Sequence, residues 1–252
     1  VDLQAAFADA AATMAALAPM VGRDAETDRW RGLAAEYRER AERLWNGHRY
    51  ADAGADGSYT DVEDVMQLAP AALGFAATER LGSVRDAVAA MDPEKVVWPM
   101  FAWTAVDAAT TAGDTETAAR IAASIVDRAY RFWDAREHDE GRTLPGIACE
   151  YWPVSGRCGG EGYGWGAFTT HLVLGVLVGL RAEADGLHVR PNLPEELRRP
   201  GSRYAVSMTI RERAVDLALL PAPDGVAVTV NGRSTELAWG EDHCWSWEDL
   251  AP

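Results

Sequence analysis

The chain has 252 residues and a mass of 27.3 kDa, the size of one large domain or two small ones. Its 48% hydrophobic and 25% charged residues predict a globular protein with a sizeable core. The net charge of −15 argues against nucleic acid or an anionic membrane surface as partner, and no apolar run is long enough to span a membrane.

Helical periodicity dominates the first two thirds of the chain. In the first periodic stretch the apolar positions are Leu3, Phe7, Met14 and Leu17, whose spacing of three to four residues predicts an amphipathic helix. Gly, Pro and Asp residues separate the later stretches. The predicted helices cover residues 2–18, 26–45, 62–81 with an interruption near Pro70, 96–112 after a start at Asp92-Pro93, 115–134 and 165–181.

A helix, a short turn and a second helix recur about three times along this part. The repetition predicts a mainly α protein built from antiparallel helical hairpins, arranged in an array or toroid. After Arg181 the apolar pattern changes to a period of two, interrupted by Gly, Pro and Asn-Gly. We therefore expect a helical domain at residues 1–181 and a β-rich segment of four or five antiparallel strands at residues 182–252.

Chemistry-bearing side chains are densest around residue 150. Glu150 precedes an aromatic pair that includes Trp152, and Glu161 lies in a Gly-rich stretch that leads to Tyr163 and Trp165. Aromatic faces stack on sugar rings, while carboxylates bind hydroxyl groups or move protons. The pattern predicts a sugar site. The alternative is a loop that caps the last helical hairpin and leaves Glu150 in solvent.

Two more tryptophans, Trp98 and Trp103, flank the start of a predicted helix. Aromatic side chains in such a helix usually belong to the core. Hairpins that alternate in direction would bring both tryptophans to the same end of the array as the Glu150 segment. This placement favours a position in the pocket for at least one of them.

Four segments carry a family resemblance when they are taken in order. They are VDLQAAF, AERLWNGHRY with DGSYTDVEDVMQLAP, VVWPMFAW, and CEYWPVSG with GGEGYGWGAF. Together they resemble the C-terminal half of the (α/α)6-barrel glycoside hydrolases of the trehalase, glucosidase I and mannosylglycerate hydrolase group. The resemblance implies that Glu150 is the catalytic base and Glu161 the second carboxylate, and that Tyr163-Gly164-Trp165 enters the last helix.

The same resemblance implies the reaction and the remaining site residues. Such enzymes hydrolyse an α-glycosidic bond of a glucoside-like oligosaccharide or glycoside, and we expect inversion, which needs an acid and a base about 6.5–9.5 Å apart. No cofactor is expected. The residues expected to bind the sugar are Glu161, Trp98, Trp103, Trp152, Tyr163 and Trp165.

Two departures from the family pattern define what we expect of the chain. Its tryptophan helix opens Trp98-Pro-Met-Phe-Ala-Trp103, where the family has W-x-G-x-[VI]-W, and the GWD-type motif of the family's general acid is absent. About six helices are predicted, where a closed barrel needs twelve. We therefore expect about half of an enzyme, which pairs with the missing N-terminal half or with itself.

The beginning of the chain is consistent with that expectation. It has no initiator Met, which indicates a processed or truncated piece, and no secretory signal, which favours the cytoplasm. One alternative function is a non-catalytic carbohydrate-binding or scaffold remnant. Another is a toroid lyase or isomerase, which the scattered histidines disfavour.

An acidic stretch between the second and third predicted helices partly fits a calcium loop. Asp52, Asp56 and Glu63 occupy its first, fifth and twelfth positions, but Gly54 stands at the third. The alternative is an acidic interhelical turn. The five histidines share no ligand spacing, and three cysteines without a CxxC pair predict neither a zinc ribbon nor a disulfide framework. We therefore expect no other metal site.

Overall fold

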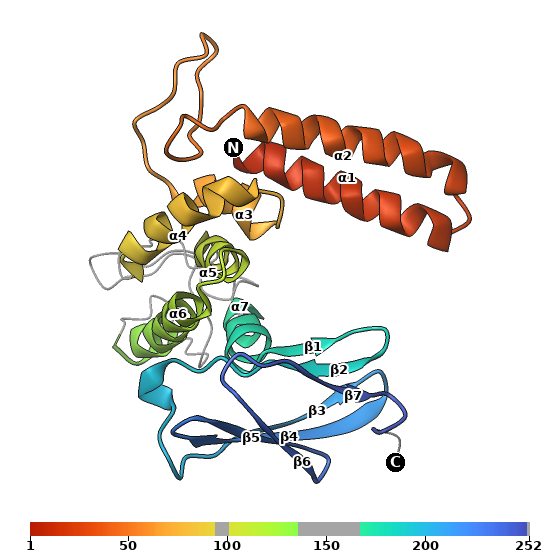
Figure 1. Ribbon diagram of the computed structural model, residues 1–252, viewed down its shortest axis with the longest axis vertical. Helices are drawn as coiled ribbons and strands as arrows, with labels where there is room; N and C mark the ends of the chain where they lie inside the picture. Colours follow the sequence, from red (N-terminus) through yellow and green to blue (C-terminus); the bar gives the residue numbers. More distant parts are fainter. Residues whose placement is uncertain (94–100, 136–166, 251–252) are drawn as a thin grey trace. The chain divides into compact units, whose positions relative to one another are not determined.

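A computed structural model of the chain describes residues 1–93, 101–135 and 167–250, with the backbone alone at 131–135 and 167. Its described residues form seven α-helices and then seven strands (Figure 1). The order confirms the expected change from helices to antiparallel strands. The chain divides into two compact units, Val1–Asp92 with Phe101–Thr117, and Pro93–Met100 with Ala118–Pro252.

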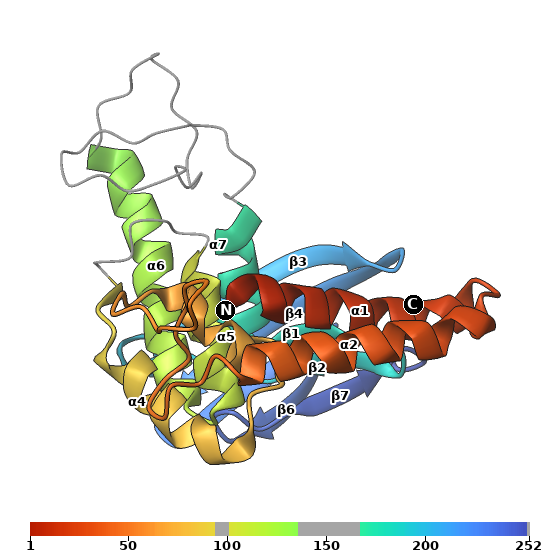
Figure 2. The ribbon, with the colours of Figure 1, turned by 90° about the horizontal axis from the view of Figure 1, so that it is seen from above.

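The first unit opens with an antiparallel helical hairpin. Helices α1 (Asp2–Met20) and α2 (Thr27–Glu42) lie side by side in both views, joined by the 3-10 turn η1 (Asp24–Glu26) (Figures 1 and 2). Both predicted helices are confirmed with shifted ends. Pro19 lies in the last turn of α1 instead of ending it.

Alanines, and not large apolar side chains, form the buried face of α1. Leu3 and Phe7 are 65% and 52% exposed, and Met14 and Leu17 are also exposed. The side chains that carry the predicted periodicity are therefore not the buried ones, although the Phe7 ring stacks at the edge of the hairpin on Tyr37 of α2, 5.1 Å away. The buried positions of α1 are Ala5, Ala8, Ala11, Ala15 and Ala18. Small side chains on the contact face let two helices approach closely, so α1 and α2 pack through this stripe.

The remainder of the first unit consists of short helices. The predicted helix at 62–81 is wrong as a continuous element. Pro70 lies in the first turn of α3, where the N–H that proline lacks would have no partner within the helix. Gly74 follows α3 with a φ of +74°, at which a helix does not continue. Helix α4 was not predicted as a separate element. The elements are η2 (Val65–Leu68), α3 (Ala69–Ala72), η3 (Thr78–Arg80), α4 (Leu81–Ala90) and α5 (Ala102–Thr111).

Helix α6 (Thr115–Ala135) confirms the helix predicted at 115–134. The last predicted helix is wrong at its end. Helix α7 (Ala167–His171) continues as the π-helical turn η7 (Leu172–Leu177), and a strand begins at Leu180. Gly179 breaks the helix with a φ of +70°, and the carbonyl oxygen of Arg190 lies 1.9 Å from the point where its Cβ would be. No other residue fits there.

The strands form two antiparallel sheets in the second unit, with orders β1-β2-β7 and β3-β4-β5-β6. The described tail therefore holds seven strands where we expected four or five. The short strands β1 and β7 account for part of the difference, because neither is long enough to show a clear period of two. The strands are β1 (Leu180–Ala182), β2 (Gly186–Val189), β3 (Tyr204–Ile210), β4 (Arg213–Ala222), β5 (Gly225–Val230), β6 (Arg233–Leu237) and β7 (His243–Ser246).

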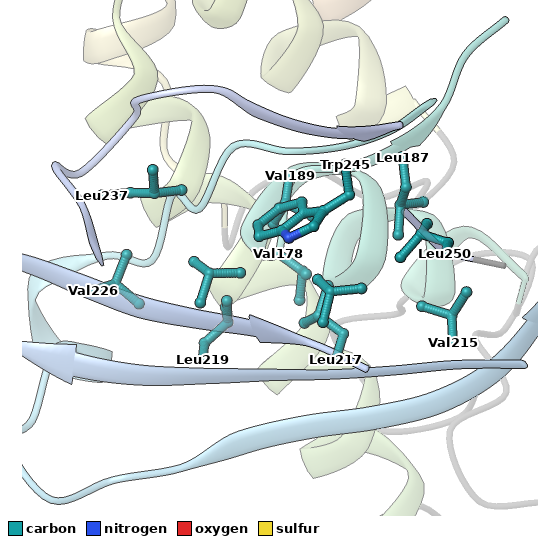
Figure 3. Close-up of a cluster of buried hydrophobic side chains, with 12 residues drawn as sticks. Val178, Leu187, Val189, Val215, Leu217, Leu219, Val226, Leu237, Trp245 and Leu250 are labelled. Carbon is teal, nitrogen blue, oxygen red and sulfur yellow. The ribbon is translucent and has the colours of Figure 1, made fainter. Parts of the chain in front are cut away.

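The core of the second unit lies between these sheets. Alternate side chains of each strand point inward, so Leu187 and Trp245 of one sheet face Leu217 and Leu219 of the other (Figure 3). The Asn231-Gly232 turn joins β5 to β6 with φ values of +48° and +80°, as expected for a two-residue hairpin.

Leu219 and Leu220 provide a matched test of this core, because they are neighbours on opposite faces of β4. Leu219 is fully buried and Leu220 is 42% exposed. We expect Leu219→Ala to lower the free energy of unfolding of the sandwich by about 2–5 kcal/mol, because it leaves a cavity. Leu220→Ala should cost less than about 1 kcal/mol. Hydrogen exchange of the β3–β6 amides measures both, and equal losses would contradict the assignment of the core.

The alanine stripe of α1 generates a second prediction. Ala8 is fully buried, whereas Ala10 is exposed on the same helix. Leucine and alanine have similar helix propensities, so Ala8→Leu and Ala10→Leu differ mainly in packing. We expect Ala8→Leu to destabilise the hairpin by about 1–3 kcal/mol through overpacking, with little change for Ala10→Leu. Hydrogen exchange in α1 and α2 reports the effect, and a stable Ala8→Leu hairpin would show that the stripe is not a close contact.

Candidate functional site

The predicted sugar site falls mostly outside the described residues. Of the predicted residues, Trp103 lies within the described ranges, on α5. The other six predicted residues lie outside the described ranges: Glu150, Glu161, Trp98, Trp152, Tyr163 and Trp165. Their arrangement, including the separation of the two carboxylates, therefore stays a prediction.

The surroundings of Trp103 bring two of the four family-like segments together. Trp103 is half-buried in the first turn of α5, beside the fully buried Thr104. The Thr104 hydroxyl donates a hydrogen bond to the sulfur of Met66 over 3.4 Å, which ties α5 to η2. Asp64 caps η2 by accepting a hydrogen bond of 2.8 Å from the Met66 amide. The tryptophan helix and the acidic turn of DGSYTDVEDVMQLAP are thus neighbours in the fold.

Each of the three calcium-loop candidates, Asp52, Asp56 and Glu63, forms a hydrogen bond or an ion pair with a different residue. Asp56 accepts hydrogen bonds from the hydroxyl and the amide of Ser58, at 2.7 and 3.1 Å, and these lower the pKa of its carboxyl. Glu63 pairs with Arg49. Asp52 accepts a hydrogen bond of 3.5 Å from Gln67.

The three carboxylates of this loop are therefore not gathered around one point. Across the described ranges, one group of three or more His, Cys, Asp or Glu side chains has all of its ligand atoms within 4.8 Å of one another. It consists of Asp185, His188 and Cys244 and lies in the β-rich tail.

A polar cluster fixes the acidic loop to the end of α2. The Tyr50 hydroxyl donates a 2.6 Å hydrogen bond to Glu42, whose other carboxylate oxygen lies 2.5 Å from Arg80. The Arg80 guanidinium also lies over the Trp45 ring, 4.8 Å from its centre. Tyr50 is 2% exposed, and burial, followed by the hydrogen bond to Glu42, raises the pKa of its phenol above the usual value. These contacts hold the loop in place and identify the cluster as structural.

The group of Asp185, His188 and Cys244 lies on the outer face of the β1-β2-β7 sheet. His188 stands directly opposite Cys244 in the β2–β7 register, and Arg181 of β1 stands opposite His188 on its other side. The His188 ring nitrogens lie 3.2 Å from Asp185 and 3.1 Å from Asp242. Arg181 donates two hydrogen bonds of 3.0 Å to Asp242.

The carboxylates set the protonation of this group. The hydrogen bond to Asp242 has the largest effect on His188 and raises the pKa of its imidazole; desolvation opposes it, and the hydrogen bond to Asp185 adds a smaller increase. Desolvation, followed by the negative charges of Asp185 and Asp242, raises the pKa of the Cys244 thiol. The free protein therefore favours a charged imidazole and a neutral thiol.

Sequence reasoning missed this group because its members are far apart in the chain. His188 and Cys244 meet only through the pairing of β2 with β7, a contact that no local spacing indicates. The sequence does indicate, through its period of two, that His188 lies on the opposite face of its strand from Leu187 and Val189.

A comparison with protein-family models found no match, and a comparison with curated proteins found no match either. Among the described residues, no helix is long and apolar enough to cross a membrane. The functional argument therefore depends on the residues themselves.

Two tyrosines test the structural role of the polar cluster. Tyr50→Phe removes a buried donor to Glu42, whereas Tyr59→Phe removes a hydroxyl that donates to backbone carbonyls from a side chain 43% exposed. We expect Tyr50→Phe to cost about 1–2 kcal/mol and Tyr59→Phe less, because water replaces the exposed hydrogen bond. Urea unfolding of the two variants measures the difference. Equal costs would mean that the cluster does not hold the loop.

Proposed function

We propose that this chain is the C-terminal part of an inverting glycoside hydrolase of the (α/α)6 type, acting on an α-glucoside-like substrate. The observation that carries the proposal is the ordered set of family-like segments, above all Glu150 eleven residues before Glu161, between tryptophans and glycines. Carboxylates beside aromatic rings are suited to sugar chemistry.

The described helices support the proposal. An antiparallel hairpin opens the chain, short helices pack beside α5, and antiparallel strands follow the helical part. The contact between α5 and η2 joins two family-like segments, as expected if both contribute to one pocket. A half-toroid of helical hairpins is the finer architecture that we propose for the helical part.

The exposed apolar side chains of α1 support a helical partner. Leu3, Phe7 and Met20 are more than half exposed. A toroid of hairpins covers each helix pair on both sides, so such a stripe suits contact with a neighbouring hairpin. We propose the N-terminal half of the same enzyme as the partner that covers it, in preference to self-association.

In the proposed mechanism Glu150 is the general base. Its carboxylate takes a proton from the water that attacks the anomeric carbon, while a general acid protonates the leaving oxygen on the opposite face. Arg142 or Arg157, close in sequence, would keep Glu150 ionised. The acid belongs to a segment outside this sequence, which has no GWD-type motif. Glu161 would bind sugar hydroxyls, and the four tryptophans of the predicted site would provide stacking surfaces.

The absence of a GWD-type motif also favours a second candidate function, a non-catalytic carbohydrate-binding or scaffold remnant. In that case the aromatic side chains would bind sugar, and Glu150 would be a hydrogen-bonding residue without a role in proton transfer. Turnover separates the two functions, because a remnant binds sugar without hydrolysing it.

Glu150→Gln in the enzyme that contains this chain tests the proposal. We expect kcat to fall by about 10²-fold or more while sugar binding is kept, because the amide cannot accept the proton of water. Added azide should restore part of the rate by replacing the lost carboxylate. Activity on an α-glucoside and the anomeric form of the product, followed by NMR, are the measurements.

Glu248→Gln is the control, because Glu248 is an exposed carboxylate in the tail. It should leave kcat unchanged. Wild-type turnover of Glu150→Gln would rule out the base assignment, and sugar binding without turnover in the unmodified enzyme would favour the remnant. Rapid hydrolysis by this chain alone would place the acid within its own sequence, with Glu161 and Asp64 as the first candidates.

A further inference from the structure

The outer face of the β1-β2-β7 sheet brings three different metal-ligating groups together. The side chains of Leu187 and Trp245 point into the sandwich, so their neighbours His188 and Cys244 point outward from adjacent strands. Asp185, in the turn before β2, completes the group, and the three ligand atoms lie within 4.8 Å of one another.

Gly186 makes room for the thiol. A Cβ at this position would lie 2.6 Å from the Cys244 sulfur and 2.4 Å from the carbonyl oxygen of Trp245. Any other residue would push β7 away from the turn that carries Asp185. The close approach of β7 to β2 thus holds the thiol beside the carboxylate.

The donor set suits zinc. Thiolate, imidazole and carboxylate are its three common protein ligands, with bonds of about 2.0–2.3 Å in a tetrahedral site. Two such ligand atoms are therefore about 3.3–3.6 Å apart. The carboxylate oxygen of Asp185 lies 3.2 Å from Nε2 of His188, close to the separation of two ligands on one ion. An exposed site leaves the fourth position to water.

A second carboxylate, that of Asp242, orients the His188 ring through the nitrogen that faces away from Asp185. Nδ1 of His188 lies 3.1 Å from Asp242, and Arg181 holds Asp242 through two hydrogen bonds. Histidines that bind metal almost always donate the other ring N–H to a carboxylate, carbonyl or water, which fixes the tautomer and the direction of the free nitrogen. Here that arrangement leaves Nε2 as the ligand on the side of Asp185.

The charge around the group also favours a cation. Asp185, Asp242, Glu183 and Asp249 all act on Cys244 as negative charges. Arg181 is already shared between Glu183 and Asp242. A divalent ion would neutralise this surplus and replace the protons of the imidazole and the thiol.

We propose that Asp185, His188 and Cys244 form a zinc site on the outer face of the β1-β2-β7 sheet, with water as the fourth ligand and Asp242 as the positioning residue for His188. This site is independent of the proposed sugar chemistry. Neither the spacing of the histidines nor that of the cysteines indicates it, because only strand pairing assembles it.

Cobalt(II) absorption and zinc calorimetry test the proposal. All proteins would carry Cys149→Ser and Cys158→Ser, so that Cys244 is the remaining thiol. We expect one cobalt ion per chain, with the near-ultraviolet charge-transfer band of a cobalt–thiolate bond and the strong visible bands of tetrahedral cobalt. Zinc should displace the cobalt and remove both features.

Single substitutions distinguish the proposed zinc ligands from the residue that positions His188. Cys244→Ser should abolish the charge-transfer band, and His188→Gln should weaken zinc binding about tenfold or more. Asp242→Asn should also weaken binding about tenfold but keep the band, because the sulfur ligand remains. His243→Gln is the matched control, since His243 is the neighbour of Cys244 on the opposite face, packed against Trp245. It should bind as the parent does.

Three results would overturn the site. They are no charge-transfer band in the folded parent protein, a band that persists in Cys244→Ser, and equal weakening by His188→Gln and His243→Gln. Hydrogen exchange of the β2 and β7 amides confirms in each case that the sheet is intact. If a ligand variant does not form the sheet, Asp185→Asn tests the site in its place, because Asp185 is exposed and lies outside the strands.

Discussion

The burial of one face of each sheet against the other is the constraint on which the C-terminal unit depends. Because side chains alternate along a strand, placing Leu187 and Trp245 in the core forces His188 and Cys244 onto the outer face. A shift of β7 by one residue against β2 would turn Cys244 inward and expose Trp245. The same packing that stabilises the sandwich therefore assembles the proposed metal site.

Close backbone approach is a second recurring constraint, and it depends on small residues. Gly179 allows the helix to end against the carbonyl of Arg190, and Gly186 allows β7 to approach the turn before β2. In the first unit, alanines such as Ala8 have the corresponding role between α1 and α2. Large apolar side chains are then left for the solvent side of the hairpin, which is why we propose that another helical segment covers them.

The two proposals depend on different kinds of evidence and on different parts of the chain. The glycoside hydrolase proposal depends on motifs around Glu150 and on the helical architecture that precedes them. The zinc proposal depends on distances among Asp185, His188 and Cys244. Failure of one leaves the other intact, since no contact between the two sites is part of either argument.

The sequence by itself determined the change from helices to antiparallel strands and the Asn231-Gly232 hairpin, because periodicity and turn chemistry are local properties. It also predicts which residues would bind a sugar, and both that site and its geometry stay predictions. Only the tertiary structure decided that alanines form the buried stripe of α1 and that Leu3 lies in solvent, since two faces of a helix can both be apolar. Only strand pairing decided that His188 meets Cys244, because contacts between distant residues depend on the register of the whole sheet.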